Sequence, residues 1–141
     1  MKVHRIALVL AIAVAQVVAQ SGKAQLAVSD RSDAAPQGYE LVDQEIQAVW
    51  KQFCANLRSG NGAGALQHMT SGSQELYRET FKALGDGIRR LPDGWTKPEL
   101  LRLSADELAE YLVTETIDGE SRIHFVVFVK SSEGVWLIEQ L

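Results

Sequence analysis

Two tyrosines and a glutamate are the residues of this sequence best suited to acid–base chemistry. Tyr111 and Glu115 lie in the stretch LAEYLVTETI, which alternates as a β-strand does, so both side chains project from one strand face. Tyr77 lies on the apolar side of an expected helix. A carboxylate that shares a cavity with a tyrosine hydroxyl can act as a general acid or base. The commoner alternative is a pair of core tyrosines with bonded hydroxyls and a solvated glutamate at a strand end.

Histidine and cysteine, the other common catalytic and metal-binding residues, are sparse. His68 lies in a short expected helix. His124 shares a strand face with Val126 and Phe128, so we expect an interface histidine there rather than a base. Cys54 is the only cysteine, lies beside an apolar helix face, and is expected to be buried and inert. The sequence holds no spacing typical of a metal site and no phosphate-binding loop, so it predicts neither a metal nor a cofactor.

The first 19 residues, MKVHRIALVLAIAVAQVVA, have the pattern of a secretory signal peptide. Lys2 and Arg5 form a basic start, an apolar stretch follows, and Val17 with Ala19 gives a small-residue cleavage pattern. We expect cleavage after Ala19. The alternative is a membrane anchor, but a helix over residues 6–19 would span only ~21 Å of a ~30 Å hydrocarbon core. The prediction is an exported bacterial protein, periplasmic or secreted, with no stable membrane anchor after cleavage.

The bulk composition indicates one globular domain. Of the 141 residues, 46% are hydrophobic and 23% are charged, which is typical of a folded soluble protein. The formal net charge is −4, and no basic cluster exceeds the pair Arg89–Arg90, so we expect no nucleic-acid partner. We divide the chain into a signal peptide over 1–19, a flexible leader over 20–38 and a domain over 39–141.

Helices are expected in the first half of the domain. Over residues 40–59 apolar side chains recur every three or four positions, which is the spacing of one helix face. A short helix is expected over 63–69. A third helix begins after a cap at Ser71 or Ser73 and runs to about residue 91, with an early end or a kink near Gly85.

After residue 95 the pattern changes to a period of two. We expect strands over 99–103, 108–117, 122–130 and 135–140. The Asp118–Gly119 pair favours a two-residue hairpin turn, because such turns need positive φ at both central residues. The predicted fold class is α+β, with three N-terminal helices packed on an antiparallel sheet of about four strands.

The strand over 122–130 is apolar on both faces. Its odd-numbered residues are all apolar from 123 to 129, and its even-numbered face holds His124, Val126 and Phe128. A strand with one face in water alternates apolar and polar residues. This strand lacks that alternation, so both of its faces must be covered. One face packs on the helices, and the other needs the leader, the third helix or another subunit. We expect the face of Val126 and Phe128 to be the partner surface.

The order of segments along the chain resembles that of a known family. The segments ALQHM, LYRETFKAL, AEYLVTETIDGE, FVVFVK and EGVWLIEQL follow one another within residues 39–141. This layout is similar to the nuclear transport factor 2-like (SnoaL-like) superfamily, and to its small exported bacterial members. The resemblance implies a curved sheet wrapped round helices into a cone-shaped α+β barrel with a cavity, often paired into dimers through the open sheet face. No acid–base residue of the family's enzymes has a counterpart at a matching position, so we assign no catalytic residue.

Three functional hypotheses follow. The first is an exported non-catalytic module that binds a small apolar ligand or a protein partner. The second is a cavity enzyme, an isomerase, dehydratase or hydrolase, that uses Glu115 with Tyr77 or Tyr111. The third is self-association, a homodimer through the sheet face. The residues expected to line the cavity are Trp50, Phe53, Tyr77, Phe81, Tyr111 and Glu115, and those expected at an interface are His124, Val126 and Phe128.

Overall fold

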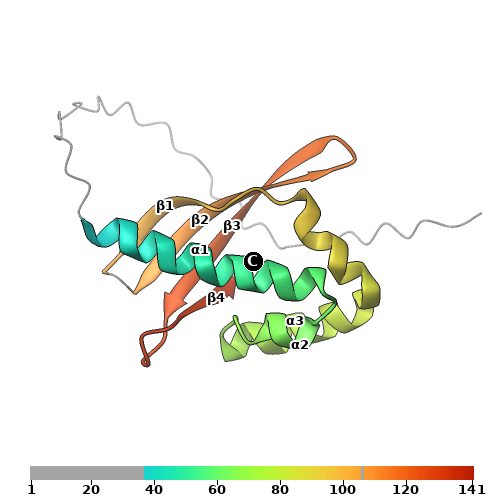
Figure 1. Cartoon of the computed structure of the whole chain (residues 1–141), viewed down its shortest axis with the longest axis horizontal. Helices are drawn as coiled ribbons and strands as arrows, with labels where there is room; N and C mark the ends of the chain where they lie inside the picture. Colours follow the sequence, from blue (N-terminus) through green and yellow to red (C-terminus); the bar gives the residue numbers. More distant parts are fainter. Residues whose placement is uncertain (1–36, 106) are drawn as a thin grey trace, which may run out of the picture. The chain divides into compact units, whose positions relative to one another are not determined.

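Helices precede a four-stranded sheet in this protein (Figure 1). The computed structural model describes residues 37–105 and 107–141, so the predicted signal peptide and nearly all of the leader lie outside the described residues. The helices are α1 (Gln37–Arg58), α2 (Gly62–Leu66), α3 (Ser71–Leu84) and the 3₁₀ helix η1 (Gly85–Gly94). The strands are β1 (Glu99–Ser104), β2 (Leu108–Ile117), β3 (Glu120–Lys130) and β4 (Trp136–Gln140). The predicted α+β class is confirmed.

Helix α1 provides one side of the core. Its apolar stripe contains Ile46, Phe53 and Leu57, all without exposed surface, and Trp50 beside them. The helix begins at Gln37, slightly before the expected start, and the glycine-containing segment after Arg58 ends it as expected. Helix α1 lies across the sheet (Figure 1), and its stripe shares one buried cluster with side chains of β2, β3 and β4.

Helix α3 ends early, next to Gly85, as the sequence predicts. It ends at Leu84 because Gly85 has a φ of +50°, a conformation that favours glycine, and the chain then continues as η1 to Gly94. Its N-cap is Thr70 rather than the expected Ser71 or Ser73, since Thr70 Oγ1 accepts from the Ser73 amide at 3.4 Å. Ser73 is buried instead, and its hydroxyl donates to the Glu139 carbonyl.

The four strands form an antiparallel sheet in the order β1-β2-β3-β4. The β2–β3 hairpin turns at Asp118 and Gly119, which both have positive φ, as the sequence predicts. This turn sets the register, in which Tyr111 lies opposite Val126 and Leu112 lies opposite Phe125. Side chains at opposed positions share a face, so the register decides which side of β3 meets the helices.

The buried face of β3 is the one that we expected to be open. Val126 and Phe128 have 0% exposure and pack in the core with Tyr111, whereas Ile123 and Phe125 on the opposite face are 63% and 59% exposed. The prediction that Val126 and Phe128 form a partner surface is therefore wrong for this chain. The physical reason is the hairpin register, which places both residues on the side of β2 that carries Tyr111.

The apolar carboxyl-terminal strand is tied to the helices as well as to β3. The Thr70 amide donates to the Ile138 carbonyl at 2.9 Å, and the Ile138 amide donates to the His68 carbonyl at 2.8 Å. The Tyr77 hydroxyl donates to the backbone oxygen of Leu141 at 2.6 Å. Trp136 and Ile138 are buried in the same cluster as the α1 stripe. The hydrophobic end of the sequence therefore closes the core.

A short segment after η1 pairs with β2 and positions Trp95. The Thr96 amide donates to the Thr114 carbonyl at 2.9 Å, and the Thr114 amide donates to Thr96 Oγ1 at 3.0 Å. The approach is so close that a Cβ atom on Gly94 would lie 2.7 Å from the Thr116 carbonyl oxygen. Only a glycine fits there without moving the backbone.

We expect Gly94→Ala to lower the free energy of unfolding by about 1–3 kcal/mol, because the added methyl group overpacks against backbone. Urea denaturation followed by tryptophan fluorescence measures the change. The matched control is Gly72→Ala in α3, where an added Cβ meets no atom within 4 Å. That variant should be as stable as the parent or more stable by up to about 1 kcal/mol. Equal stability of the two variants would contradict the close packing at Gly94.

Candidate functional site

Glu115, His124 and Trp95 meet at the end of the buried sheet face. Trp95 Nε1 donates to Glu115 Oε1 at 3.1 Å, and Glu115 Oε2 lies 2.9 Å from His124 Nε2. The Glu115 and His124 side chains are 14% and 30% exposed. His124 lies opposite Val113 in the hairpin, so both members of the pair continue the face of Tyr111 and Val113 beyond its last buried residue. This cluster is the candidate functional site.

The bonding of Glu115 fixes the state of the His124 ring. An ionised carboxylate only accepts hydrogen bonds, so His124 Nε2 must carry a hydrogen to bond Glu115 Oε2. In the neutral ring, Nδ1 is then the nitrogen with a lone pair. A carboxylate that holds an imidazole in one tautomer is an arrangement by which enzymes orient a general base. The pair can also bind a ligand that donates a hydrogen bond to Nδ1.

Aromatic rings lie next to this cluster. The Trp95 ring centroid is 5.4 Å from that of Trp50 and 6.5 Å from that of Phe53, and the planes of Trp95 and Phe53 differ by only 4°. Such ring pairs stabilise each other beyond the area that they bury. The Trp95 indole is therefore held by stacking on one side and by Glu115 through its N–H, which leaves Glu115 with a fixed orientation.

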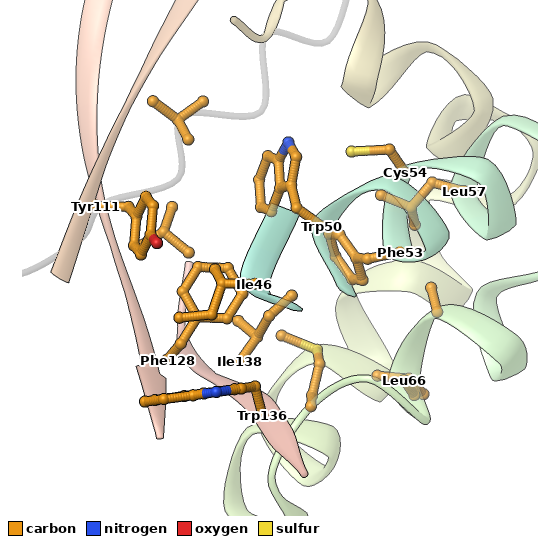
Figure 2. Packing of buried hydrophobic residues seen from close by; sticks show 14 of the residues in the cluster. Ile46, Trp50, Phe53, Cys54, Leu57, Leu66, Tyr111, Phe128, Trp136 and Ile138 are labelled. Carbon is orange, nitrogen blue, oxygen red and sulfur yellow. The ribbon is translucent and has the colours of Figure 1, made fainter. Parts of the chain in front are cut away.

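The other residues expected to line a cavity are packed in the core. Figure 2 shows Trp50 and Phe53 of α1 in one cluster with Tyr111 and Phe128 of the strands. Phe53 and Tyr111 have no exposed surface, and Trp50 is 6% exposed. These side chains contact one another, so their apolar surface serves the folded core.

Neither candidate tyrosine bonds to Glu115. The Tyr111 hydroxyl donates to Asp43 Oδ1 at 2.9 Å, and burial together with the Asp43 carboxylate raises the pKa of Tyr111 well above its usual value. The Tyr77 hydroxyl bonds to the chain end, and burial raises the pKa of Tyr77 while that bond opposes the shift. The partners of Glu115 are His124 and Trp95 instead.

Sequence reasoning missed Asp43 and Trp95. Asp43 lies three residues before Ile46 and seven before Trp50, a helical spacing that places it at the start of the apolar stripe. That spacing could have identified it as the partner of a buried hydroxyl. Trp95 follows a Pro-Asp-Gly turn and has no periodic context, so nothing in the sequence indicates its contact with Glu115.

His68 and Cys54 lie outside the Glu115–His124 cluster. Cys54 is buried, as expected, and burial raises the pKa of its thiol to about 11, so it stays protonated at neutral pH. His68 Nε2 lies 3.3 Å from Asn56 Nδ2, and burial lowers the pKa of His68. The amide nitrogen is a donor, so His68 accepts through Nε2.

No protein-family model matches the chain, and no curated protein is similar to it. Within the part of the chain that the structure describes, no helix is long and apolar enough to cross a membrane. Within the same residues, no three carboxylate, histidine or cysteine side chains gather as metal ligands would.

We expect Glu115→Ala to lower the free energy of unfolding by about 1–3 kcal/mol, because it leaves the Trp95 indole N–H and the His124 ring without their shared acceptor. Thermal and urea unfolding measure the loss. The control is Glu133→Ala, which removes an exposed carboxylate from the turn between β3 and β4 and should change stability by less than about 0.5 kcal/mol. Equal losses in the two variants would show that Glu115 does not hold this cluster together.

Proposed function

We propose that this chain is an exported, non-catalytic binding module, and that its outer sheet face docks on a second copy of the chain. Export rests on the N-terminal sequence pattern, which predicts a periplasmic or secreted protein. The outer face is the side of the sheet turned away from α1, and its apolar side chains include Leu101, Leu112, Ile123, Phe125, Val127 and Val129. The main support for this proposal is that Phe125 and Ile123 are exposed on this face.

The outer face combines exposed apolar side chains in a continuous patch. Ile123 is 63% exposed, Phe125 is 59% exposed and Leu101 is 49% exposed. Leu112 lies directly across from Phe125 in the register, so their side chains are neighbours. Single exposed apolar residues are ordinary, but a contiguous patch on a sheet face supports an interaction surface.

The charges on the same face favour a second copy of the chain as the partner. Arg102 and Glu110 lie opposite each other in the β1–β2 register, and both side chains point to the outer side. In a two-fold symmetric dimer every contact occurs twice, because the two copies exchange roles. Arg102 of one copy can therefore face Glu110 of the other, twice, around an apolar centre.

The size of the face is compatible with a dimer interface. Four strands about 4.8 Å apart and about 20 Å long give a face of about 400 Å² in plan. Protruding side chains make the accessible area of the face larger than its plan area. The accessible area therefore comes closer to the ~800 Å² that each partner buries in a standard interface.

An interior apolar ligand has less support than a partner on the outer face. Trp50, Phe53 and Tyr111, which would have lined its cavity, fill the core. A dimer through the sheet face is also what the resemblance to the nuclear transport factor 2-like superfamily implies. Membership of that superfamily is part of the proposal and is supported by the order of helices and strands.

We expect Phe125→Glu to convert a dimer into a monomer, because it places two charges at the centre of the apolar contact. Sedimentation velocity over a range of protein concentrations measures the change. The control is Leu76→Glu, since Leu76 is 71% exposed on α3 and lies outside the proposed interface. The control should remain a dimer. A parent protein that is monomeric at all concentrations would refute the proposal, and equal dissociation by both variants would refute the assignment of the face.

A cavity enzyme is the second candidate, and the Glu115–His124 pair is the observation that favours it. With Nε2 bonded to Glu115, His124 Nδ1 can take a proton from a substrate, and Glu115 stabilises the resulting imidazolium. This differs from the expected pairing of Glu115 with a tyrosine. The supported reaction classes remain isomerisation, dehydration and hydrolysis.

Assays of ester hydrolysis, dehydration and isomerisation would test this second candidate. His124→Asn should abolish any turnover found, because asparagine retains a hydrogen bond to Glu115 but is not a base at neutral pH. Phe125→Glu should leave the turnover unchanged. Activity that survives His124→Asn would exclude the pair as its source.

A further inference from the structure

A groove between the helices has features of a second binding site, separate from the sheet face. It lies among α2, α3 and η1 and has a volume of about 710 Å³. Its floor is formed by Leu66, Phe81 and Ile88, whose side chains are otherwise buried. Pockets for small ligands typically measure about 300–1,000 Å³ and combine an apolar lining with a few polar groups. The groove has this combination.

One wall of the groove is basic. Arg78 and Lys82 lie four residues apart on α3, so they are neighbours on one face of that helix. Both are exposed. Within residues 37–105 and 107–141, no carboxylate lies within 4.0 Å of Arg78, and Lys82 only reaches Glu79 at 4.0 Å. Two cations with exposed head groups therefore border an apolar floor.

The groove also holds one acidic residue, Asp86, whose side chain is exposed. Asp86 Oδ1 lies 3.4 Å from Arg89 Nε, and the Arg89 guanidinium covers Gly60, where an added Cβ would lie 2.7 Å from it. The lining therefore holds two cations against one carboxylate, in a protein whose net charge is −4. A positive, partly apolar groove is complementary to a small anion that carries an apolar tail.

We propose that this groove binds a small amphiphilic carboxylate. The carboxylate contacts Arg78 and Lys82, since an arginine fork pairs with two carboxylate oxygens at once. The apolar tail lies on Leu66, Phe81 and Ile88. The proposal goes beyond docking through the sheet face, because none of these residues belongs to that face.

Gly62 gives a way to close the groove. It lines the groove, and a Cβ added there would lie 3.4 Å from Ile88 Cδ1 and 3.6 Å from Phe81 Cβ. A small side chain would therefore contact the floor without a severe clash, and a longer one would extend into the space for the tail. Gly62→Leu is the blocking variant, and Arg78→Gln with Lys82→Gln is the charge variant.

Titration of the purified protein with octanoate, followed by ¹H–¹⁵N NMR and calorimetry, tests the proposal. We expect saturable shifts at the amides of Gly60, Gly62 and Gly85, which line the groove. The charge variant should weaken octanoate binding at least tenfold, and 1-octanol should bind more weakly than octanoate. Added salt should weaken octanoate binding as well, because the contacts are exposed. Gly62→Leu should abolish the shifts.

Two control variants distinguish binding in the groove from a general loss of charge and from the sheet face. Lys51→Gln with Lys97→Gln removes two exposed lysines elsewhere and should leave the affinity unchanged. Phe125→Glu should also bind octanoate normally, so a failed dimer proposal and a failed groove proposal are distinguishable. Absence of saturable binding, equal affinity for octanol, or full binding by the charge variant would overturn the inference. If Gly62→Leu does not fold, the charge variant decides the question, because its two side chains are exposed.

Discussion

The packing of the α1 stripe on one face of β2 and β3 is the constraint on which the rest of the structure depends. Tyr111, Val126 and Phe128 lose all exposed surface in this contact, at a gain of about 25 cal/mol per Å² of apolar area. Burying the Tyr111 hydroxyl requires a partner, and Asp43 of α1 supplies it. That hydrogen bond joins α1 to β2. Because side chains alternate along a strand, the same contact turns Ile123 and Phe125 outward.

The position of the Glu115–His124 cluster follows from where this contact ends. The buried face of the hairpin continues past Val113, where apolar residues give way to Glu115 and His124. There the face is partly buried, so the two polar groups need hydrogen-bond partners. They bond to each other, and the Trp95 N–H donates to the second carboxylate oxygen. The groove with Arg78 and Lys82 has a different origin, since it lies where α3 stops at Gly85 and the chain turns into η1.

The parts of the fold that depend on local sequence patterns could be predicted. Which of the two apolar faces of β3 packs on the helices could not. The β2–β3 hairpin is predictable because Asp118 and Gly119 allow a tight turn, and the break at Gly85 is predictable from glycine. The two faces of β3 are almost equally apolar, so the sequence holds no signal for which one meets α1, and we assigned Val126 and Phe128 wrongly. The turn alone implies that Glu115 and His124 are near each other, but the contact with Trp95 depends on a segment without periodicity.

The reactivity of a cysteine placed at position 125 tests whether β3 turns this face outward and docks on a second copy through it. Cys54 is buried and has a raised thiol pKa, so Phe125→Cys adds one readily reactive thiol. In dilute protein, we predict that a maleimide labels position 125 as fast as it labels Leu76→Cys. At higher protein concentration, labelling at position 125 should slow while labelling at position 76 does not. A thiol at position 125 that is as unreactive as Cys54 in dilute protein, or that reacts at one rate at every concentration, would contradict the account.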